Sequence, residues 1–361
     1  MINVLHVVSR LDSGGVESML YSYYLKMDRT KIHFDFLVHK TVDGLYARKF
    51  RELGCDIYPL TPRRESVLKN FRDIFRGMSR KKYDIIHSHI GAESFIPLSM
   101  AFFKGIDVRI AGAHCAIRPN ILKKCMLWLT YFFATKYAAC SDLSALVTFK
   151  KKSGEYFLLK NGVDVQRFLF NEENRITIRN QYHVDDDCIL LGNIGRLVWE
   201  KNQKFLIDLL YELNKGSIAR YKLMIVGDGI LKEDLQSQAK EHGILSQVFF
   251  VEPQNEIEKY YSAFDVFMFP STNEGFGIVA IEAQINGLPV LASNTLSNEL
   301  NISPMYRSID VNNINVWCEN LKKLNCKYSK SNRKIQSIRK EDYDIAMLAD
   351  SLMSFYKENA N

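Results

Sequence analysis

The sequence lacks several patterns that would decide its class at once. Its 361 residues contain no run of the roughly 18–20 apolar residues that a membrane-spanning helix needs. No basic segment precedes the strand-like residues 1–8, so we expect no secretory signal. Seven cysteines without a C-x-x-C pair argue against a zinc site and against a disulfide framework. We therefore expect buried thiols and a cytoplasmic protein.

Charge is divided unevenly along the chain. Residues 1–166 carry 26 Lys and Arg against 15 Asp and Glu, whereas the remainder carries 22 against 26. A basic first half favours an anionic partner. Because the sequence lacks zinc-finger, RNP and basic-zipper patterns, we expect no nucleic acid and favour an anionic membrane surface, with the protein peripheral on the inner face of the membrane.

Two segments of the first half could contact such a surface. One carries four cations at helical spacing, namely Lys69, Arg72, Arg76 and Arg80. The other is the apolar stretch 125–134, which follows two lysines in the manner of an interfacial helix. A solvated helix face and a core helix are the alternative interpretations.

Short apolar runs alternate with helical patterns and predict an α/β protein with parallel, doubly wound sheets. In the first half the expected strands are 3–9, 33–39, 56–60, 84–89, 108–114, 136–141 and 155–161. In the second half they are 188–197, 222–226, 248–251, 264–269, 289–293 and 306–311. The chain length predicts two domains, and the alternation of strands and helices in each half predicts that both are Rossmann-like. The turn signal at residues 161–164 places the boundary between domains 1–166 and 167–341. A final amphipathic helix is expected over 342–358.

The most informative stretch is residues 270–283, PSTNEGFGIVAIEA, between an expected buried strand and an apolar helix. Gly275 and Gly277 permit a tight turn that leaves backbone N–H groups bare at the helix start, where the dipole favours a phosphate. Glu274 and Glu282 stand near this turn as hydrogen-bond acceptors for hydroxyl groups. The combination indicates a sugar joined to a phosphate, and the alternative is an ordinary turn with solvated glutamates.

Arg196 and Lys201 follow the first strand of the second half. Two cations at the carboxyl end of a strand, near the turn before residue 278, would neutralise a diphosphate: the arginine as a planar fork and the lysine as a point charge. The alternative is two ordinary surface cations beside a helix cap.

Glycines and histidines mark further strand ends in the first half. Gly14 and Gly15 allow a ligand to approach the backbone closely, without the G-x-G-x-x-G pattern of dinucleotide-binding proteins. His87, His89 and His114 end expected strands, so we expect them to point toward the ligand. His-x-His could be half of a metal site, but no third ligand is visible at useful spacing, and no metal is expected.

Together these motifs resemble those of retaining, nucleotide-sugar-dependent glycosyltransferases of the GT-B fold, family four or glycosyltransferase group 1, similar to bacterial capsular and exopolysaccharide enzymes. The resemblance is carried by Glu-Gly-Phe-Gly with a second Glu eight positions after the first, by Gly-Arg-Leu with Glu-Lys-Asn, and by Val-Gly-Asp-Gly and Asn-Gly-Val-Asp. The stretches 252–254 and 293–299 lack glycines that many relatives have, so the nucleotide and the sugar stay open.

The resemblance implies two domains facing across a cleft and transfer of a hexosyl or N-acetylhexosaminyl group, most simply from a UDP-sugar, to an acceptor hydroxyl. Glu274 and His114 would contact the sugar, while Arg196 and Lys201 would bind the diphosphate. The remaining donor contacts would come from Gly14, Gly15, Gly227, Phe276, Gly277, Ile278 and Glu282. The resemblance implies no metal or other cofactor, and it implies that the helix over 342–358 returns to the first domain.

The basic first domain suggests a lipid-linked glycan acceptor, as in capsule, exopolysaccharide or O-antigen synthesis. A GT-B sugar-nucleotide epimerase and a non-enzymatic nucleotide-sugar or lipid-surface binding module are the alternatives. A glycoside hydrolase would also need paired carboxylates, but it has no use for the Arg196 and Lys201 pair.

Overall fold

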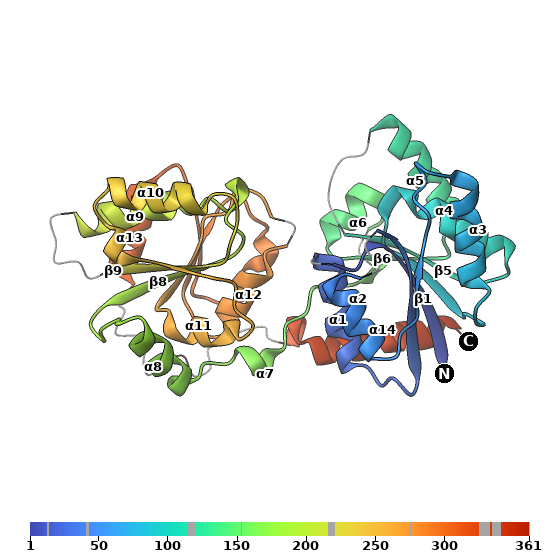
Figure 1. The fold of residues 1–361 in the computed structure, drawn as a ribbon, viewed down its shortest axis with the longest axis horizontal. Coiled ribbons are helices and arrows are strands. Elements are labelled where there is room, and N and C mark those ends of the chain that lie inside the picture. Colours follow the sequence, from blue (N-terminus) through green and yellow to red (C-terminus); the bar gives the residue numbers. More distant parts are fainter. Residues whose placement is uncertain are drawn as a thin grey trace. The chain divides into compact units, whose positions relative to one another are not determined.

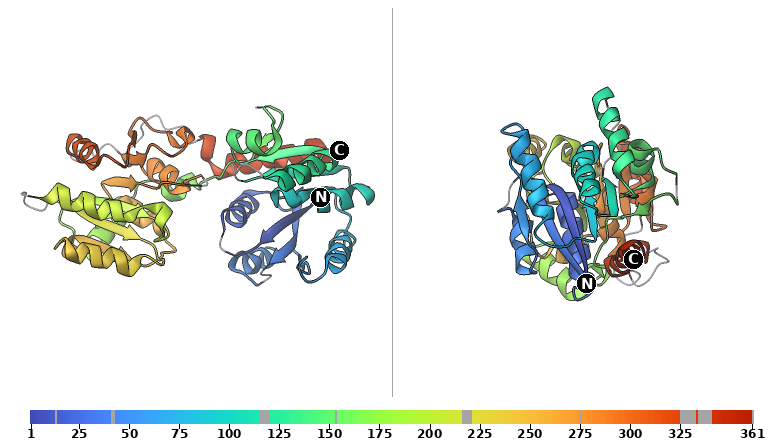
Figure 2. Two further views of the ribbon diagram at one scale, coloured as in Figure 1. Left: turned by 90° about the horizontal axis from the view of Figure 1, so that it is seen from above. Right: turned by 90° about the vertical axis from the view of Figure 1, so that its right-hand side faces the viewer.

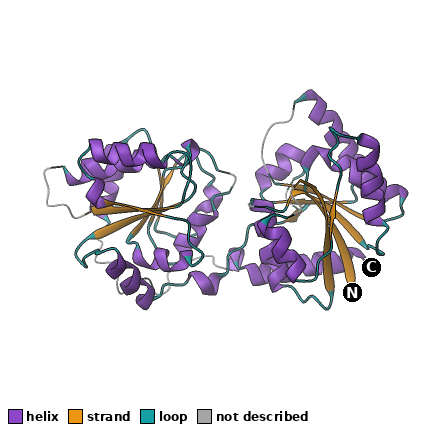
Figure 3. Ribbon diagram, in the orientation of Figure 1, coloured by secondary structure: helices purple, strands orange, loops and turns teal. Residues whose placement is uncertain are grey.

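The computed structural model of the protein describes residues 1–12, 14–40, 43–114, 120–152, 154–215, 221–274, 276–324, 333 and 341–360. The chain forms two compact units, Met1–Gly162 with Tyr343–Asn361 and Val163–Asp342. Each unit has its own parallel sheet with helices on both faces (Figures 1 and 3). The division falls slightly before the expected one, because α7 (Val165–Phe168) packs against helices of the second unit.

The first unit is built on a parallel sheet with the strand order β3-β2-β1-β4-β5-β6-β7. The strands are β1 (Ile2–Arg10), β2 (Ile32–Lys40), β3 (Ile57–Pro59), β4 (Ile85–Ser88), β5 (Val108–Ala113), β6 (Lys136–Ala139) and β7 (Phe157–Leu158). Each coincides with an apolar run that the sequence predicts as a strand. The order reverses between β1 and β4, where His6 lies opposite His87.

The helices of the first unit are α1 (Gly15–Lys26), α2 (Leu45–Glu52), α3 (Val67–Met78), α4 (Phe95–Phe103), α5 (Ile121–Phe133), α6 (Asp142–Phe149) and α14 (Ile345–Ala360). Ser66, Asn120 and Ser141 start α3, α5 and α6, and each side chain accepts a hydrogen bond from a backbone N–H of the first turn. These caps satisfy groups that a helix start leaves without an intrahelical partner.

Two apolar layers pack against the first sheet. One layer lies against α1, α2 and α14, where Tyr23, Phe34 and Tyr356 are fully buried. The other lies against α3, α4 and α6 and includes Ile74 and Phe149. As expected, the last helix packs in the first unit, next to α1 (Figure 2).

The second unit has a parallel sheet with the order β10-β9-β8-β11-β12-β13. Its strands are β8 (Ile189–Ile194), β9 (Tyr221–Val226), β10 (Val248–Val251), β11 (Val266–Phe269), β12 (Val290–Ser293) and β13 (Tyr306–Ile309). Its helices, besides α7, are α8 (Glu172–Gln181), α9 (Gln203–Asn214), α10 (Lys232–Glu241), α11 (Ile257–Ala263), α12 (Ile278–Ile285) and α13 (Ile314–Lys323). One face is covered by α9, α10 and α13, whose core includes the fully buried Trp317.

The sequence predicts buried cysteines and no membrane-spanning helix. In the described residues Cys55, Cys140, Cys188 and Cys318 are buried as expected, but Cys125 is exposed because α5 covers little of the core. None of the helices in the described parts of the chain combines the length and the apolarity needed to cross a bilayer.

Candidate active site

Two loops of the second unit meet at the point where its strand order reverses. β8 and β11 are parallel neighbours, so the loops that follow them leave the sheet at the same edge. Doubly wound proteins bind ligands at such switch points, beyond the carboxyl ends of the strands. The loop after β8 carries Arg196 and Lys201, and the loop after β11 carries Glu274 and Gly277. The topology thus brings both motifs to one edge of one sheet.

The turn before α12 depends on Gly277, which adopts the left-handed conformation with a φ of 86°. A Cβ atom there would lie 2.9 Å from the Phe269 ring, so only glycine fits. Ile278 begins the helix and Phe276 is half-buried, whereas Gly275 lies outside the described residues. The Ala280 N–H donates to the Gly277 carbonyl oxygen at 2.9 Å, and the N–H groups before it lie at the helix start, where the helix dipole favours an anion.

Glu274 and Lys201 form an ion pair beside this turn. Glu274 Oε1 lies 2.5 Å from Lys201 Nζ, and the two side chains are only 11% and 19% exposed. Lys201 Nζ also lies 5.9 Å from the centre of the Phe269 ring, the ring that Gly277 accommodates. Phe269 therefore connects the ion pair to the start of α12.

Contacts between the two loops fix the position of Lys201. The Thr272 N–H donates to the Glu200 carbonyl oxygen at 2.9 Å, and the Asn202 side-chain amide donates to the Pro270 carbonyl oxygen at 3.3 Å. Asn202 has a φ of 53°, a left-handed conformation that Asn tolerates better than most residues. The residues on both sides of Lys201 are thus tied to the loop that bears Glu274.

Arg196 lies on the same loop as Lys201 and is exposed. The buried Gln203 side chain donates to the Arg196 carbonyl oxygen at 3.0 Å and holds the backbone from the interior. A Cβ atom at Gly195 would lie 3.6 Å from Lys201 Cε, so the lysine side chain passes along this part of the loop. Considering only the described residues, the Arg196 guanidinium has no ion pair or hydrogen bond and is available for an anion.

Gly227 supports the Arg196 loop from the neighbouring strand. It has a φ of 149°, and a Cβ atom there would lie 2.0 Å from the Gly195 carbonyl oxygen. Beside it, the Leu197 N–H donates to the Asp228 carbonyl oxygen at 2.9 Å. The structure thus gives Gly227 a role in packing the loop, and direct contact with a donor stays a prediction.

Glu282 lies on α12 and faces Tyr261 of α11. The Tyr261 hydroxyl donates to Glu282 Oε2 at 2.6 Å. Burial raises the pKa of Glu282 to about 7, although the bond from Tyr261 lowers it in part. Near neutral pH the carboxyl group can therefore accept hydrogen bonds from ligand hydroxyls when ionised and donate one when protonated.

In the first unit, Gly14 and Gly15 begin α1 with different surroundings. A Cβ atom at Gly14 would lie 2.5 Å from Glu17 Oε2, whereas a Cβ atom at Gly15 would meet open space. Glu17 is buried, and its Oε1 lies 3.5 Å from Arg10 Nε. Gly14 therefore makes room for a buried carboxylate, and Gly15 leaves the start of α1 unobstructed.

His114 follows β5 and is half-buried, with Nε2 2.8 Å from His89 Nδ1. Burial lowers the pKa of His114 to about 4, so the ring is neutral at physiological pH. The expectation that His87 and His89 point toward a ligand is wrong, because both are buried and His87 bonds the Tyr356 hydroxyl of α14. Side chains stand perpendicular to a sheet, so a place at the end of a strand does not direct them outward.

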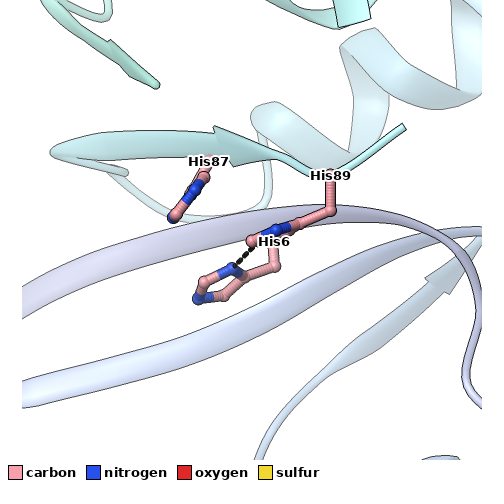
Figure 4. A group of neighbouring side chains, drawn as sticks. All are labelled: His6, His87 and His89. Atoms are coloured by element: carbon pink, nitrogen blue, oxygen red, sulfur yellow. Dashed lines mark hydrogen bonds between the residues drawn. The ribbon is translucent and has the colours of Figure 1, made fainter. Parts of the chain in front are cut away.

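The expectation that His87 and His89 lack a third partner is also wrong. One ring nitrogen of each of His6, His87 and His89 lies within 4.8 Å of the others (Figure 4). His6 is far away in sequence, and the strand order places β1 beside β4.

Comparison with known proteins agrees with this geometry. Residues 174–340 match the family profile of the glycosyl transferases group 1. The second unit of the chain is therefore similar to these glycosyl transferases. The chain is 28% identical over 340 residues to the putative glycosyltransferase EpsF of Bacillus subtilis, covering 88% of this chain and 86% of EpsF. It is 24% identical to the capsular polysaccharide biosynthesis glycosyltransferase CapH of Staphylococcus aureus, covering 90% of this chain and 91% of CapH.

Solved structures confirm the GT-B fold of this chain. HepE from Anabaena in complex with UDP superimposes with a TM-score of 0.79 at 18% identity, covering 99% of this chain and 100% of HepE. The family match does not favour the epimerase alternative, and it supports a transferase.

Several residues that hold the candidate site in place were not predicted from the sequence. Phe269 ends the expected strand and Asn202 lies within Glu-Lys-Asn, so both could have been identified from the motifs. Tyr261 and Gln203 gave no local signal, because their polar atoms meet the site only through helix packing.

Replacing Glu282 with Gln should stabilise the ligand-free enzyme at pH 8 but not at pH 4. The pKa of Glu282 rises from 4.5 to about 7 on folding, so the native state holds a proton that the unfolded state releases in this window. Stability is therefore lost as pH rises through the window, by about 3 kcal/mol above it. Glutamine removes this loss because it carries no charge.

Urea unfolding of the wild type and Glu282→Gln at both pH values measures the difference. Glu241→Gln, an exposed change on α10 of the same unit, is the matched control and should alter stability little at either pH. An equal effect of Glu282→Gln at pH 4 and pH 8 would contradict the assignment.

Proposed function

We propose that the enzyme transfers a sugar from a nucleotide-diphosphate donor, most simply a UDP-sugar, to an acceptor hydroxyl with retention of configuration. The observation that carries the proposal is the Lys201–Glu274 pair, held beside the N-terminus of α12 at the switch point of the second sheet. HepE, which has the same fold, has been crystallised with UDP and with UDP and glucose. These ligands support a nucleotide-sugar donor here.

The proposed chemistry follows from where charge develops. When the bond between sugar and phosphate breaks, negative charge grows on the leaving diphosphate. Arg196, Lys201 and the N–H groups that start α12 would stabilise this charge more strongly in the transition state than in the ground state. We propose that these groups suffice without a metal ion.

Glu274 would orient the transferred sugar through its hydroxyl groups. Its present partner is Lys201, so a bound donor would have to share or replace part of that ion pair. A diphosphate that draws Lys201 Nζ toward itself would free Glu274 Oε1 to accept a sugar hydroxyl. Glu282, held by Tyr261, would accept the ribose hydroxyls.

Donor binding can be tested by thermal unfolding with a panel of UDP-, GDP- and dTDP-sugars. A ligand at a hundred times its Kd stabilises the folded state by about 2.7 kcal/mol. We expect donors of one nucleotide class to raise the midpoint temperature of unfolding. When an acceptor is added, we expect the sugar of that donor to be transferred and the free nucleotide to be released. No stabilisation by any of these donors would contradict the proposal.

A lipid-linked glycan is the acceptor that the first unit supports best. CapH is a glycosyltransferase of capsular polysaccharide biosynthesis, and WclY, a relative from Escherichia coli, is a glycosyltransferase of O-antigen biosynthesis. We propose a related role here, in the cytoplasm at an anionic membrane surface. The support from the chain itself is an exposed surface that combines apolar and basic side chains.

This surface, named the α3–α5 surface, is formed by α3, α4 and α5. In α5 only Thr130 is buried, which excludes the core-helix interpretation of this segment. Aromatic rings continue from α5 to α4, since the centre of the Phe133 ring lies 5.8 Å from that of Phe102 and 6.4 Å from that of Phe103. The exposed large apolar residues are Val67, Leu68, Phe71, Phe75, Phe102, Phe103, Ile121, Leu122, Trp128, Tyr131 and Phe132.

Basic residues accompany these apolar side chains. Four cations that the sequence places at helical spacing are exposed on α3 or just after it: Lys69, Arg72, Arg76 and Arg80. Lys104 connects α4 with α3, because its Nζ lies 4.6 Å from the centre of the Phe75 ring. Apolar rings that enter the headgroup region, with cations beside them, are typical of a protein that lies on an anionic membrane.

Reversing Arg72, Arg76 and Arg80 to Glu should weaken binding to anionic vesicles at least a hundredfold. Each cation near such a surface contributes about 1 kcal/mol, and the new carboxylates add repulsion. Co-sedimentation with phosphatidylserine vesicles measures the effect. The matched control reverses three exposed lysines of the second unit, Lys204, Lys215 and Lys240, and should bind like the wild type. Equal losses in both triple variants would point to net charge rather than to this surface.

A further inference from the structure

Four histidines and one tyrosine form a connected group inside the first unit. His114 Nε2 lies 2.8 Å from His89 Nδ1, and His89 Nε2 lies 2.9 Å from His6 Nδ1. Beside them, His87 Nδ1 lies 2.8 Å from the Tyr356 hydroxyl. Figure 4 shows the rings of His6, His87 and His89 gathered at β1 and β4, with the bond between His6 and His89. The group extends from the buried sheet to the half-buried His114.

Gly112 provides the space in which His89 and His114 meet. A Cβ atom at this position would lie 3.2 Å from His114 Nε2 and 3.2 Å from His89 Nδ1, the two atoms of their hydrogen bond. It would also lie 3.0 Å from the Ser88 carbonyl oxygen. The glycine two residues before His114 is therefore required by this contact rather than by a turn.

Burial keeps all four rings neutral. It lowers the pKa of His114 to about 4 and that of His6 to about 3, and it holds the pKa values of His87 and His89 well below 6.5. A neutral imidazole has one donor nitrogen and one acceptor nitrogen. Both ring nitrogens of His89 form hydrogen bonds, one with His6 and one with His114. The position of the proton on any one of these three rings therefore determines its position on the other two.

The hydrogen bonds of the His6–His89–His114 series can run from His6 to His114 or from His114 to His6, and Tyr356 determines which direction is adopted. In the described part of the chain, His87 is the hydrogen-bond partner of the buried Tyr356 hydroxyl, so the hydroxyl donates its proton to His87 Nδ1. Neutral His87 then carries its own proton on Nε2, a buried nitrogen without a partner among the described residues. A hydroxyl that accepted instead would leave two groups unpaired, its own proton and the lone pair of His87 Nε2, whereas the donating hydroxyl leaves only the His87 Nε2–H group unpaired.

His87 in turn disfavours a second unpaired N–H group on His6. The two ring centres are 5.6 Å apart, and His6 Nε2 is likewise buried with no partner among the residues described. Protons on both Nε2 atoms would place two buried N–H groups without acceptors on neighbouring rings, whereas a lone pair on His6 Nε2 leaves only the His87 proton without an acceptor. His6 therefore donates from Nδ1 to His89 Nε2, and His89 donates from Nδ1 to His114 Nε2.

We propose that Tyr356, His87, His6 and His89 are positioning residues that hold the proton of His114 on Nδ1. His114 thereby presents an N–H donor to a hydroxyl oxygen of the transferred sugar. The contact with the sugar rests on the proposed function, whereas the tautomer of His114 does not depend on it.

Two-bond ¹H–¹⁵N spectra of the whole protein labelled with ¹⁵N-histidine test the tautomer directly. His114→Asn identifies the His114 signals by their loss. We expect a protonated Nδ1 and an unprotonated Nε2 on His114 in the wild type. The opposite tautomer would overturn the proposal. One equivalent of metal in the purified protein, held by His6, His87 and His89, would also overturn it, because coordinated nitrogens cannot form this series.

Tyr356→Phe should convert the His114 signals into those of a mixture of tautomers and lower kcat about tenfold with little change in KM for the donor. Tyr23→Phe is the matched control, since Tyr23 is equally buried in the same core but donates to the Lys160 carbonyl oxygen. It should keep the single tautomer and the wild-type kcat. The same loss in both variants would overturn the assignment to Tyr356.

His89 offers a second route if Tyr356→Phe does not fold. In His89→Gln the amide can accept from His6 and donate to His114, so the His114 tautomer should be retained, and His89→Leu should lose it. Identical spectra for these two variants would overturn the proposal. If the tautomer is as expected but His114→Asn transfers sugar at the wild-type rate, the contact with the sugar is wrong, and donor binding by the second unit is unaffected by that result.

Discussion

Replacing Lys201 with Ala should lower kcat for sugar transfer at least a hundredfold. Lys201 lies at the switch point, and its ammonium group would meet the charge that develops on the leaving diphosphate. Removal of one such preorganised group from an active site typically raises the barrier by about 3 kcal/mol. The effect should appear in kcat and in kcat/KM, because the interaction is strongest in the transition state. Steady-state kinetics with a matched donor and acceptor measure it.

Loss of Lys201 also leaves Glu274 without its ion-pair partner, so folding must be checked. Glu274 is only 11% exposed, and an unpaired carboxylate there costs stability. Lys204→Ala, three residues further along and exposed on α9, is the control for loss of one positive charge from this region. A folded Lys201→Ala enzyme with a kcat like that of Lys204→Ala would contradict the proposed role of Lys201.

Replacing Gly227 with Ala should destabilise the second unit by on the order of 4 kcal/mol. Its φ of 149° lies in a region that side chains rarely adopt, and the new Cβ atom would lie 2.0 Å from a backbone oxygen of Gly195. The clash cannot be relieved by rotating a side chain, so the Arg196 loop has to move. Thermal unfolding without ligand measures the loss, and donor binding should weaken with it.

Gly243→Ala separates the clash from the cost of a positive φ. Gly243 has a φ of 70° in the same unit, and a Cβ atom there would meet open space. Its replacement should cost only about 1–2 kcal/mol. If the two variants unfolded at the same temperature, the close approach of Gly227 to the Arg196 loop would not be what constrains this position.

The strands were predictable because each is a short apolar run bounded by turn residues. The buried strand that ends at Phe269 and the helix that begins at Ile278 were both expected. The turn between them carries the Glu-Gly-Phe-Gly motif and also lies at the switch point of the sheet. Parallel pairing then places successive strand ends at one edge, so the proximity of the Arg196 loop to the Glu274 loop followed from the alternation of strands and helices.

Side-chain partners across the fold were not predictable in the same way. The Lys201–Glu274 pair joins two loops that are far apart in sequence, and the sequence assigned the two residues to separate parts of the ligand. His87 was expected to point toward the ligand because it ends a strand, but α14 returns over that face and places Tyr356 against it. Such contacts depend on which helix covers which face, and no local pattern encodes that.

The central claim is that Arg196, Lys201 and the N–H groups at Gly277 and Ile278 bind the diphosphate of the donor. Isothermal titration of UDP and UMP into the wild type, Arg196→Ala and Lys201→Ala tests it directly. The account predicts that the wild type prefers UDP over UMP and that each substitution reduces this preference about tenfold, the effect of losing one charge-assisted bond. A preference for UDP that is unchanged in both variants would contradict the account.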